Sequence, residues 1–271
     1  MNCLIVNIVV FVNVFISVLC ADEWDYLNFE AWPETCKTGH RQSPIDLNQK
    51  KAEARTPAPF KFYSYNKRFK ADIQNSGHGV VITLSPENKG AVSLAGSVLP
   101  ETYIFDNLHF HWPSEHTING KYYPLEAHFV HYARSAGSVA EGLKRPNGIA
   151  VLGVLLELSL DANPAYESIV RALPNITEDI RRPVQLDKPI ALAAFLPENK
   201  KSYFYYEGSL TTPACNEAAL WTVFTQRVKI GQKQYNTLKH IYNIKKQLLI
   251  MNNRPLQQLY GRTVKYSTCC Q

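Results

Sequence analysis

Residues Asn107 to His131 read N-L-H-F-H-W-P-S-E-H-T-I-N-G-K-Y-Y-P-L-E-A-H-F-V-H, and the fold is organised around this stretch. His109 and His111 are two residues apart, so in a β-strand both side chains point to one face. After a turn that contains Pro-Ser and Asn-Gly, the run Leu125 to Tyr132 predicts a second strand, which carries His128. If the two strands pair, three imidazoles gather on one face. Three neutral imidazoles can hold a zinc ion and leave a fourth tetrahedral position open.

Glu126 lies on the same face of the second strand as His128. Metal-bound histidines usually donate their other ring N–H to a carboxylate or a carbonyl group. A surface carboxylate is the alternative, but the strand around Glu126 is apolar. We therefore predict that Glu126 is the hydrogen-bond partner of a metal-binding histidine.

The run resembles the α-class carbonic anhydrases in the motifs H-F-H-W, S-E-H-T and E-x-H-x-V-H. The similarity continues in the family's order over nearly the whole chain after residue 22. It includes W-D-Y at Trp24 to Tyr26, R-Q-S-P-I at Arg41 to Ile45, S-G-H at Ser76 to His78, A-V-L-G at Ala150 to Gly153, G-S-L-T-T-P at Gly208 to Pro213, L-W at Leu220 to Trp221, and N-R-P at Asn253 to Pro255.

The resemblance implies a zinc enzyme that reversibly hydrates CO2 to bicarbonate and a proton. His109, His111 and His128 would hold the zinc, and a zinc-bound hydroxide would attack CO2. Thr211 and Glu115 match the family's orienting pair. An ionised Glu115 can only accept, so Thr211 would donate its proton to Glu115 and accept a hydrogen bond from the hydroxide.

The resemblance also assigns a substrate pocket and a proton path. His78, in Ser76-Gly77-His78-Gly79, matches the family's proton shuttle, and histidine has an unperturbed pKa near neutrality. The flanking glycines would give its ring room to swing; an ordinary exposed loop histidine is the alternative. CO2 carries no charge, and the residues that match its pocket are Val130, Val151, Leu210, Thr212 and Trp221.

Asn107 stands where the family often has glutamine as the partner of the first ligand. Asparagine is one methylene shorter, so we expect its hydrogen bond to His109 to lengthen or to pass through water. We expect structural positions for the remaining histidines, in a loop or the core for His116 and His131, and at the surface for His40 and His240.

The N-terminus predicts export. Positions 4–19 are apolar apart from Asn and Ser, and no second apolar run of about 20 residues follows. We interpret residues 1–20 as a signal peptide and residues 21–271 as the α-carbonic anhydrase domain. An uncleaved N-terminal anchor is the alternative. We expect a secreted protein with no membrane span after cleavage.

Secretion affects how the cysteines are interpreted. In an oxidising compartment, Cys36 and Cys215 are natural partners, and they match a disulfide of secreted family members. Two separate buried thiols are the alternative. Cys269 and Cys270 leave open either unpaired thiols or intermolecular disulfides, and hence an oligomer.

The remaining composition indicates an ordinary globular enzyme. The net charge is +6, but the basic residues are scattered and form no stripe with interleaved aromatics, so we expect no nucleic-acid partner. The expected partners are the small substrates CO2 and bicarbonate. Asn175-Ile176-Thr177 is an acceptor sequence for glycosylation at Asn175.

Periodicity predicts an α+β, sheet-dominated fold. Helices are expected over Asn163 to Leu173, which starts with an Asn-Pro cap, and over Gln232 to Lys246. The resemblance implies a single domain on a large, twisted, mostly antiparallel sheet with short peripheral helices. Strands are expected over Gly79 to Leu84, Asn107 to Trp112, Leu125 to Tyr132, Ile149 to Leu158 and Ala219 to Ile230.

Two other functions compete with CO2 hydration. A carbonic-anhydrase-like binding module would use the fold without catalysis, since fold does not imply activity. The chain keeps all three histidines together with Glu115 and Thr211, which favours an enzyme. A zinc esterase with another substrate would use the same site.

Overall fold

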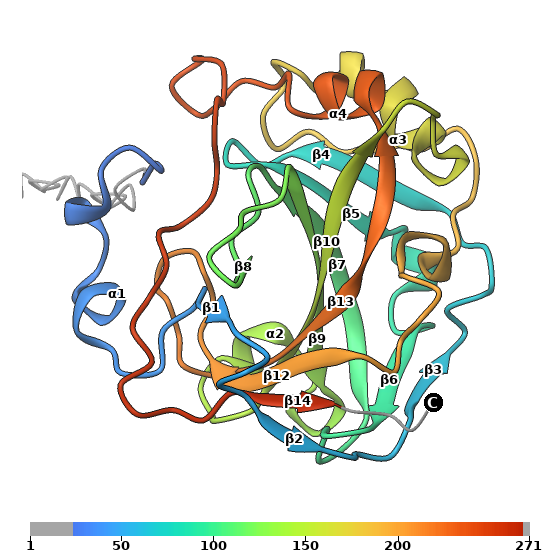
Figure 1. The fold of residues 1–271 in the computed structure, drawn as a ribbon. Helices are drawn as coiled ribbons and strands as arrows, with labels where there is room; N and C mark the ends of the chain where they lie inside the picture. The colour runs from blue at the N-terminus through green and yellow to red at the C-terminus, as the bar shows by residue number, and fades with distance from the viewer. Residues whose placement is uncertain (1–23, 268–271) are drawn as a thin grey trace, which may run out of the picture.

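A twelve-stranded β-sheet dominates the computed structural model, which describes residues 24–267 (Figure 1). Its strands are β2 (Glu53–Arg55), β3 (Phe60–Tyr63), β4 (Ala71–Asn75), β5 (Val80–Leu84), β6 (Ser93–Gly96), β7 (Tyr103–His111), β9 (Leu125–Ala133), β10 (Ile149–Ser159), β11 (Val184–Gln185), β12 (Tyr203–Gly208), β13 (Ala219–Gly231) and β14 (Lys265–Ser267). Two short strands, β1 (Asp46–Leu47) and β8 (Thr117–Ile118), pair with each other.

The strand order confirms the predicted fold class. The main path runs β11-β4-β5-β7-β9-β10-β13-β12-β14-β2, with β6 beside β7 and β3 beside β6. Within this sheet the pairs β10–β13 and β14–β2 are parallel. All other pairs in it are antiparallel. The long strands β7, β9, β10 and β13 run through the middle of this single domain (Figure 1).

The five strands predicted from the sequence are all present, with bounds that differ by a few residues. The largest difference is at β7, which begins at Tyr103 rather than Asn107. Tyr103 to Phe105 extend the strand because they pair with β9 on one side, and Tyr103 and Ile104 also pair with β6 on the other. That pairing depends on distant segments, which local periodicity does not show.

The helices are short and peripheral, as expected: α1 (Glu34–Thr38), α2 (Val139–Gly142), α3 (Glu167–Ala172) and α4 (Gln232–Leu238). The helix predicted from Asn163 is present as α3 flanked by 3-10 turns, and the Asn163 side chain accepts the N–H of Ala165 at 3.0 Å. The 3-10 turns are Phe29–Ala31, Pro86–Asn88, Arg134–Ala136, Pro164–Tyr166, Leu173–Asn175 and Leu192–Phe195.

The prediction of a helix as far as Lys246 is wrong, because α4 ends at Leu238. Beyond it, the backbone N–H of Tyr242 donates to Thr177 O at 3.1 Å instead of continuing the helix. Ile241 is buried all the same. The apolar spacing was therefore correct about burial and wrong about the backbone.

Two apolar clusters cover the two faces of the central strands. Alternation along β9 and β10 divides their side chains between the clusters. The larger cluster takes Leu125, Ala127, Phe129, Leu152 and Val154, and the other takes Val130 and Val151. Because both faces are covered, β9 is buried along its whole length. His128 thus lies on the face of the second cluster, away from water.

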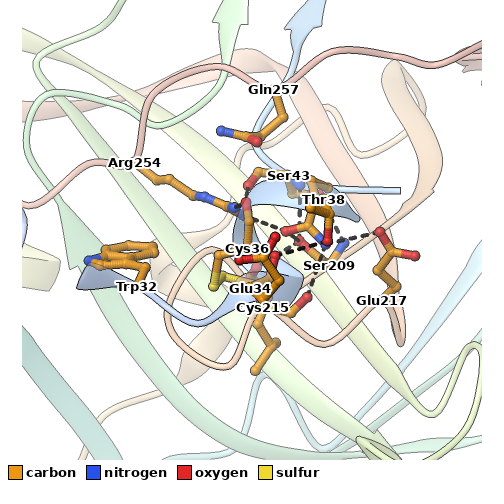
Figure 2. The surroundings of a disulfide bond; sticks show 12 residues. Trp32, Glu34, Cys36, Thr38, Ser43, Ser209, Cys215, Glu217, Arg254 and Gln257 are labelled. Carbon is orange, nitrogen blue, oxygen red and sulfur yellow. Dashed lines mark hydrogen bonds between the residues drawn. A yellow bond between two sulfur atoms is a disulfide. The ribbon is translucent and has the colours of Figure 1, made fainter. Parts of the chain in front are cut away.

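A disulfide joins Cys36 in α1 to Cys215, with a Cα–Cα distance of 5.1 Å (Figure 2). It ties the N-terminal segment to the loop that follows β12. Around the bond, Gln42 Nε2 donates to Cys215 O at 3.1 Å and Arg254 Nη2 donates to Cys36 O. The predicted pairing is confirmed.

Three predictions fall outside the described residues. The signal peptide at residues 1–20 precedes Trp24, and Cys269 and Cys270, with the oligomer they would allow, follow Ser267. Between residues 24 and 267 the longest helix has only seven residues, so none in this range is long and apolar enough to span a bilayer.

Replacing Cys36 and Cys215 together by serine should lower the free energy of unfolding by roughly 2–5 kcal/mol, because the bond closes a long loop in the unfolded chain. The cysteines are 179 residues apart. Denaturant unfolding of the oxidised wild type and the double variant measures the loss. Reduced wild type is the matched control and should resemble the variant. Equal midpoints for oxidised wild type and variant would contradict a stabilising role.

Candidate active site

Strands β7 and β9 bring the three predicted histidines together. In their antiparallel register His109 lies opposite His128, and His111 lies opposite Glu126. The ring centroids are 5.1 Å apart for His109 and His111, 5.2 Å for His109 and His128, and 4.5 Å for His111 and His128. One ring nitrogen from each histidine lies within 4.8 Å of the other two, a spacing that can hold a metal ion.

The outer nitrogen of His109 meets Asn107 directly. His109 Nδ1 lies 2.7 Å from Asn107 Oδ1, so the expectation of a long or water-mediated contact is wrong. The shorter side chain reaches because the two residues are neighbours on one face of β7. Asn107 Nδ2 in turn donates to Asp106 Oδ2 at 2.8 Å, which points the amide oxygen toward the ring.

The other two rings are held in the same way. His111 Nδ1 lies 2.7 Å from the backbone oxygen of Asn252, and His128 Nε2 lies 2.8 Å from Glu126 Oε1. With these contacts made, the opposite nitrogens, His111 Nε2 and His128 Nδ1, are buried and meet no hydrogen-bond partner among the described residues. Buried polar atoms are normally satisfied. This donor set therefore fits a divalent cation such as zinc, which imidazole nitrogens bind readily.

Glu126, on β9, is hydrogen-bonded to the loop between β7 and β9. Oε2 accepts the backbone N–H groups of Glu115 and His116 at 2.9 and 2.8 Å. Oε1 lies 2.8 Å from His116 Nδ1 and 2.8 Å from His128 Nε2. Burial alone would raise the pKa of Glu126, but the adjacent His116 and His128 outweigh it and hold that pKa well below its usual range. An ionised, fully buried carboxylate thus orients His128, as predicted.

Burial also keeps the three imidazoles neutral. It lowers the pKa of His109 well below the usual value, lowers that of His111 to about 4, and lowers that of His128. A neighbouring protonated histidine would lower the pKa further at each ring, whereas the charge of Glu126 opposes the decrease at all three. Neutral imidazole is the form that binds a metal, so the cluster is ready as a ligand set at neutral pH.

Glu115 lies directly beside the cluster. Its Oε2 is 3.6 Å from His111 Nε2, and its Oε1 accepts the backbone N–H of Arg254 at 2.9 Å. Burial raises the pKa of Glu115 to about 7, while His128 and the neighbouring Thr211 hydroxyl oppose that rise. The predicted pair, Glu115 and Thr211, is therefore brought together next to the three histidines.

A cavity of about 290 Å³ opens in front of the histidines. Every residue predicted for the substrate side lines it, and so do His78, Asn107 and Thr211. Sequence analysis did not single out several other lining residues. Trp24 and Tyr26 lie in the W-D-Y motif, and Asn252 directly precedes the N-R-P motif. For Val139 and Ile149, nothing in the sequence indicated a place in the cavity other than their apolar side chains. These additional lining residues are Trp24, Tyr26, Val81, Val139, Ile149 and Asn252.

His78 lies at the mouth of this cavity, but its ring is not in open space. It stacks on the Trp24 indole with centroids 3.7 Å apart and planes 5° apart. Burial, and then the positive charge of Arg181, lower the pKa of His78 to about 4. Gly77 packs closely too, because a Cβ there would lie 2.2 Å from Ile244 Cγ2. In this arrangement the ring is held against Trp24 on one side while it lines the cavity.

The remaining histidines take structural or surface positions. His116 is buried, and its Nε2 lies 2.7 Å from the Tyr206 hydroxyl. His131 is buried between Tyr65 and the backbone oxygen of Ala150, which is 3.2 Å from Nδ1. His40 and His240 are exposed.

Comparison with known proteins identifies the class. The family model for eukaryotic-type carbonic anhydrase matches residues 22–268. The chain therefore belongs to the eukaryotic-type, α-class carbonic anhydrases, and it is a carbonate dehydratase with a histidine triad able to bind a metal.

Three mammalian relatives share the name carbonic anhydrase 4. The Rattus norvegicus protein is 34% identical over 247 residues, which cover 87% of this chain and 78% of the relative. The Oryctolagus cuniculus protein is 34% identical, covering 90% and 81%. The Mus musculus protein is 35% identical, covering 87% and 77%.

The contacts of Glu126 yield a prediction. Glu126→Gln replaces one acceptor oxygen by an NH2 group, so two of the four N–H groups now bound lose their acceptor. Zinc affinity should fall by about 10–100-fold, as measured by competition with a chelator. The matched control is Glu207→Gln, because the Glu207 side chain is 54% exposed and does not line the cavity. An unchanged zinc Kd in Glu126→Gln would show that the carboxylate does not support the metal site.

Proposed function

We propose that the chain is a zinc-dependent carbonic anhydrase that reversibly hydrates CO2 to bicarbonate and a proton. The observation that carries this proposal is the pair of buried, unpartnered nitrogens, His111 Nε2 and His128 Nδ1, on rings whose other nitrogens are held. With His109 they would provide three neutral ligands. When bound, zinc would make a nucleophilic oxygen available from water near neutral pH; carbonic anhydrase is itself the standard example of this effect, with a water pKa of about 7.

Thr211 and Glu115 would orient the reaction. The carboxylate of Glu115 accepts the Arg254 N–H through Oε1, which leaves Oε2 for the Thr211 hydroxyl. A divalent cation beside Glu115 would favour its ionised form. Thr211 Oγ1, having donated its only proton, would then accept a hydrogen bond from a metal ligand that carries hydrogen. Ligands that carry no hydrogen would be disfavoured.

The apolar wall would hold CO2. Val130, Val151 and Trp221 are at most 7% exposed and face the cavity in front of the histidines. Leu210 and Thr212 complete the assigned wall beside Thr211. An uncharged, linear substrate loses little by leaving water for such a surface, whereas the charged bicarbonate product is favoured to leave.

His78 would pass the product proton to buffer. It lines the cavity together with the three histidines and lies, partly buried, at its mouth. A histidine with access to solvent has a pKa near neutrality and can relay protons through water.

The disulfide and the glycosylation sequence support export of the protein. The Cys36–Cys215 disulfide supports an oxidising compartment. Asn175 is exposed at the end of a 3-10 turn, in keeping with glycosylation. We infer that residues 1–20 are a signal peptide, that the mature protein is secreted, and that Cys269 or Cys270 is available for intermolecular pairing.

Purified protein should contain about one zinc per chain and should hydrate CO2 in a stopped-flow assay. Alanine at His109, His111 or His128 should remove the metal or most of the activity. His240→Ala is the matched control, since His240 is exposed and does not line the cavity. A chelator or an aromatic sulfonamide should inhibit the wild type. Full zinc occupancy with normal hydration in any of the three variants would refute the ligand assignment.

Thr211→Ala should keep zinc but slow hydration by on the order of 10²-fold, the usual cost of losing one preorganised hydrogen-bonding group. The pH profile of turnover should also move upward. Thr211→Ser is the matched control, because it restores the hydroxyl and should recover much of the rate. If Thr211→Ala matched the wild type in rate and pH profile, the hydroxyl would have no orienting role.

A further inference from the structure

The N-terminal residues of the described chain lie against His78 at the mouth of the active-site cavity. Trp24 stacks on the His78 ring at 3.7 Å and meets Tyr26 and Trp32 edge-on, with centroids 5.1 and 5.2 Å away. Trp24, Tyr26 and His78 all line the cavity. The position of the His78 ring therefore depends on what holds Trp24.

Asp25 holds that segment. Its Oδ1 accepts the backbone N–H groups of Leu27 and Asn28 at 2.9 and 3.0 Å, and its backbone oxygen accepts Trp32 Nε1–H at 2.9 Å. Its Oδ2 forms an ion pair with Lys245 Nζ at 2.5 Å. Lys245 is 220 residues away in sequence, so this pair is a long-range link.

The loop of Lys245 is bonded to the loop of His78. The backbone N–H of Ile244 donates to Gly77 O at 3.3 Å. Asn243 Oδ1 accepts the backbone N–H groups of Lys245 and Gln247 at 2.9 and 3.0 Å, which shapes the turn. Contacts therefore run in a closed circuit from His78 through Gly77 and Ile244 to Lys245, then through Asp25 and Trp24 back to His78.

We propose that the Asp25–Lys245 ion pair is a clamp that keeps His78 stacked on Trp24 and so restrains its proton-relay movement. The inference rests on the relay role proposed above for His78. Asp25 and Lys245 are positioning residues, since they act on His78 through Trp24 and through the loop. Opening the clamp frees the imidazole to reach water at the cavity mouth.

Burial of the stacked ring opposes proton uptake for a physical reason. A ring that is partly buried loses some of the water that would stabilise its charged form. Burial and Arg181 lower the pKa of stacked His78 to about 4, while Asp25 opposes this decrease. A donor with a pKa near 7 passes its proton poorly to such a base. An unstacked, hydrated ring returns toward the usual pKa of about 6.5.

The clamp is open to solvent on the lysine side. The Lys245 side chain is 52% exposed and that of Asp25 is 11% exposed, so salt screens the pair from the side of Lys245. The other links in the circuit are backbone hydrogen bonds and ring stacking, which salt screens little. Breaking the ion pair therefore loosens the segment while the turn at Leu27 and Asn28 persists.

Lys245→Gln tests the clamp, with Lys246→Gln as the matched control, since Lys246 is the exposed next residue and loses the same charge. The first readout is the NMR shift of the His78 Hε1 proton, which the Trp24 ring current displaces while the rings stack. Lys245→Gln should move this shift toward its free value, and Lys246→Gln should not. The second readout is CO2 hydration in weak buffer, which should rise several-fold in Lys245→Gln only. In saturating imidazole buffer all three proteins should turn over equally.

Asp25→Asn is the second variant, because the amide oxygen still accepts the Leu27 and Asn28 N–H groups. It removes a negative charge near His78, whereas Lys245→Gln removes a positive one. A change in the same direction in both variants thus reports the clamp and not the local field. Opposite changes in the two variants, or an unmoved Hε1 shift in Lys245→Gln, would overturn the proposal.

His78→Ala separates this proposal from the proposed function. If His78→Ala is slow in weak buffer while Lys245→Gln matches the wild type, the relay stands and the clamp is overturned. If His78→Ala is as fast as the wild type, the relay role is overturned, and the clamp's effect on turnover with it. Zinc content and hydration in strong buffer test the metal site independently of both outcomes.

Discussion

The buried carboxylate of Glu126 is the interaction on which the active site depends. It accepts four N–H groups, from the backbone of Glu115 and His116 and from the rings of His116 and His128. Three of these donors belong to the loop between β7 and β9, and the fourth belongs to His128 on β9. One buried carboxylate therefore fixes the position of this loop relative to β9. Such a charge is tolerated in the core only because every lone pair has a partner.

A second set of polar contacts connects this centre to the two ends of the chain. Arg254 binds Glu115 through its backbone N–H, while its buried guanidinium donates to Cys36 O, Gln42 Oε1 and Ser43 O. Figure 2 shows that guanidinium beside the Cys36–Cys215 disulfide. The loop of Thr211 and the carboxylate of Glu115 are therefore held by one network, and its elements lie more than 200 residues apart in sequence. The contacts that hold Glu115 and the Thr211 loop in place therefore form only when distant segments of the chain meet.

The cavity mouth is built differently from the floor formed by the three histidines. The floor consists of strand histidines whose outer nitrogens are hydrogen-bonded and whose inner nitrogens are left free as ligands. The mouth consists of two loops and the N-terminal segment, joined by a backbone hydrogen bond, ring stacking and one ion pair. Weak, solvent-screened contacts permit movement, and strong buried ones prevent it. This contrast would suit the proposed function, in which the metal ligands stay fixed while protons are exchanged with buffer.

The amino-acid sequence by itself determined the features that depend on the alternation of side chains along a strand and on local motifs. Alternation in two strands put His109, His111, His128 and Glu126 on one face, and the family motifs assigned Glu115, Thr211 and the disulfide. Tertiary structure decided the rest: the early end of α4, the short Asn107–His109 contact, the Asn252 carbonyl on His111, and the stacking of His78 on Trp24. The physical reason is distance along the chain. Strand parity depends on neighbouring residues, whereas each of the other features, apart from the Asn107 contact, requires segments that meet only when the sheet is assembled.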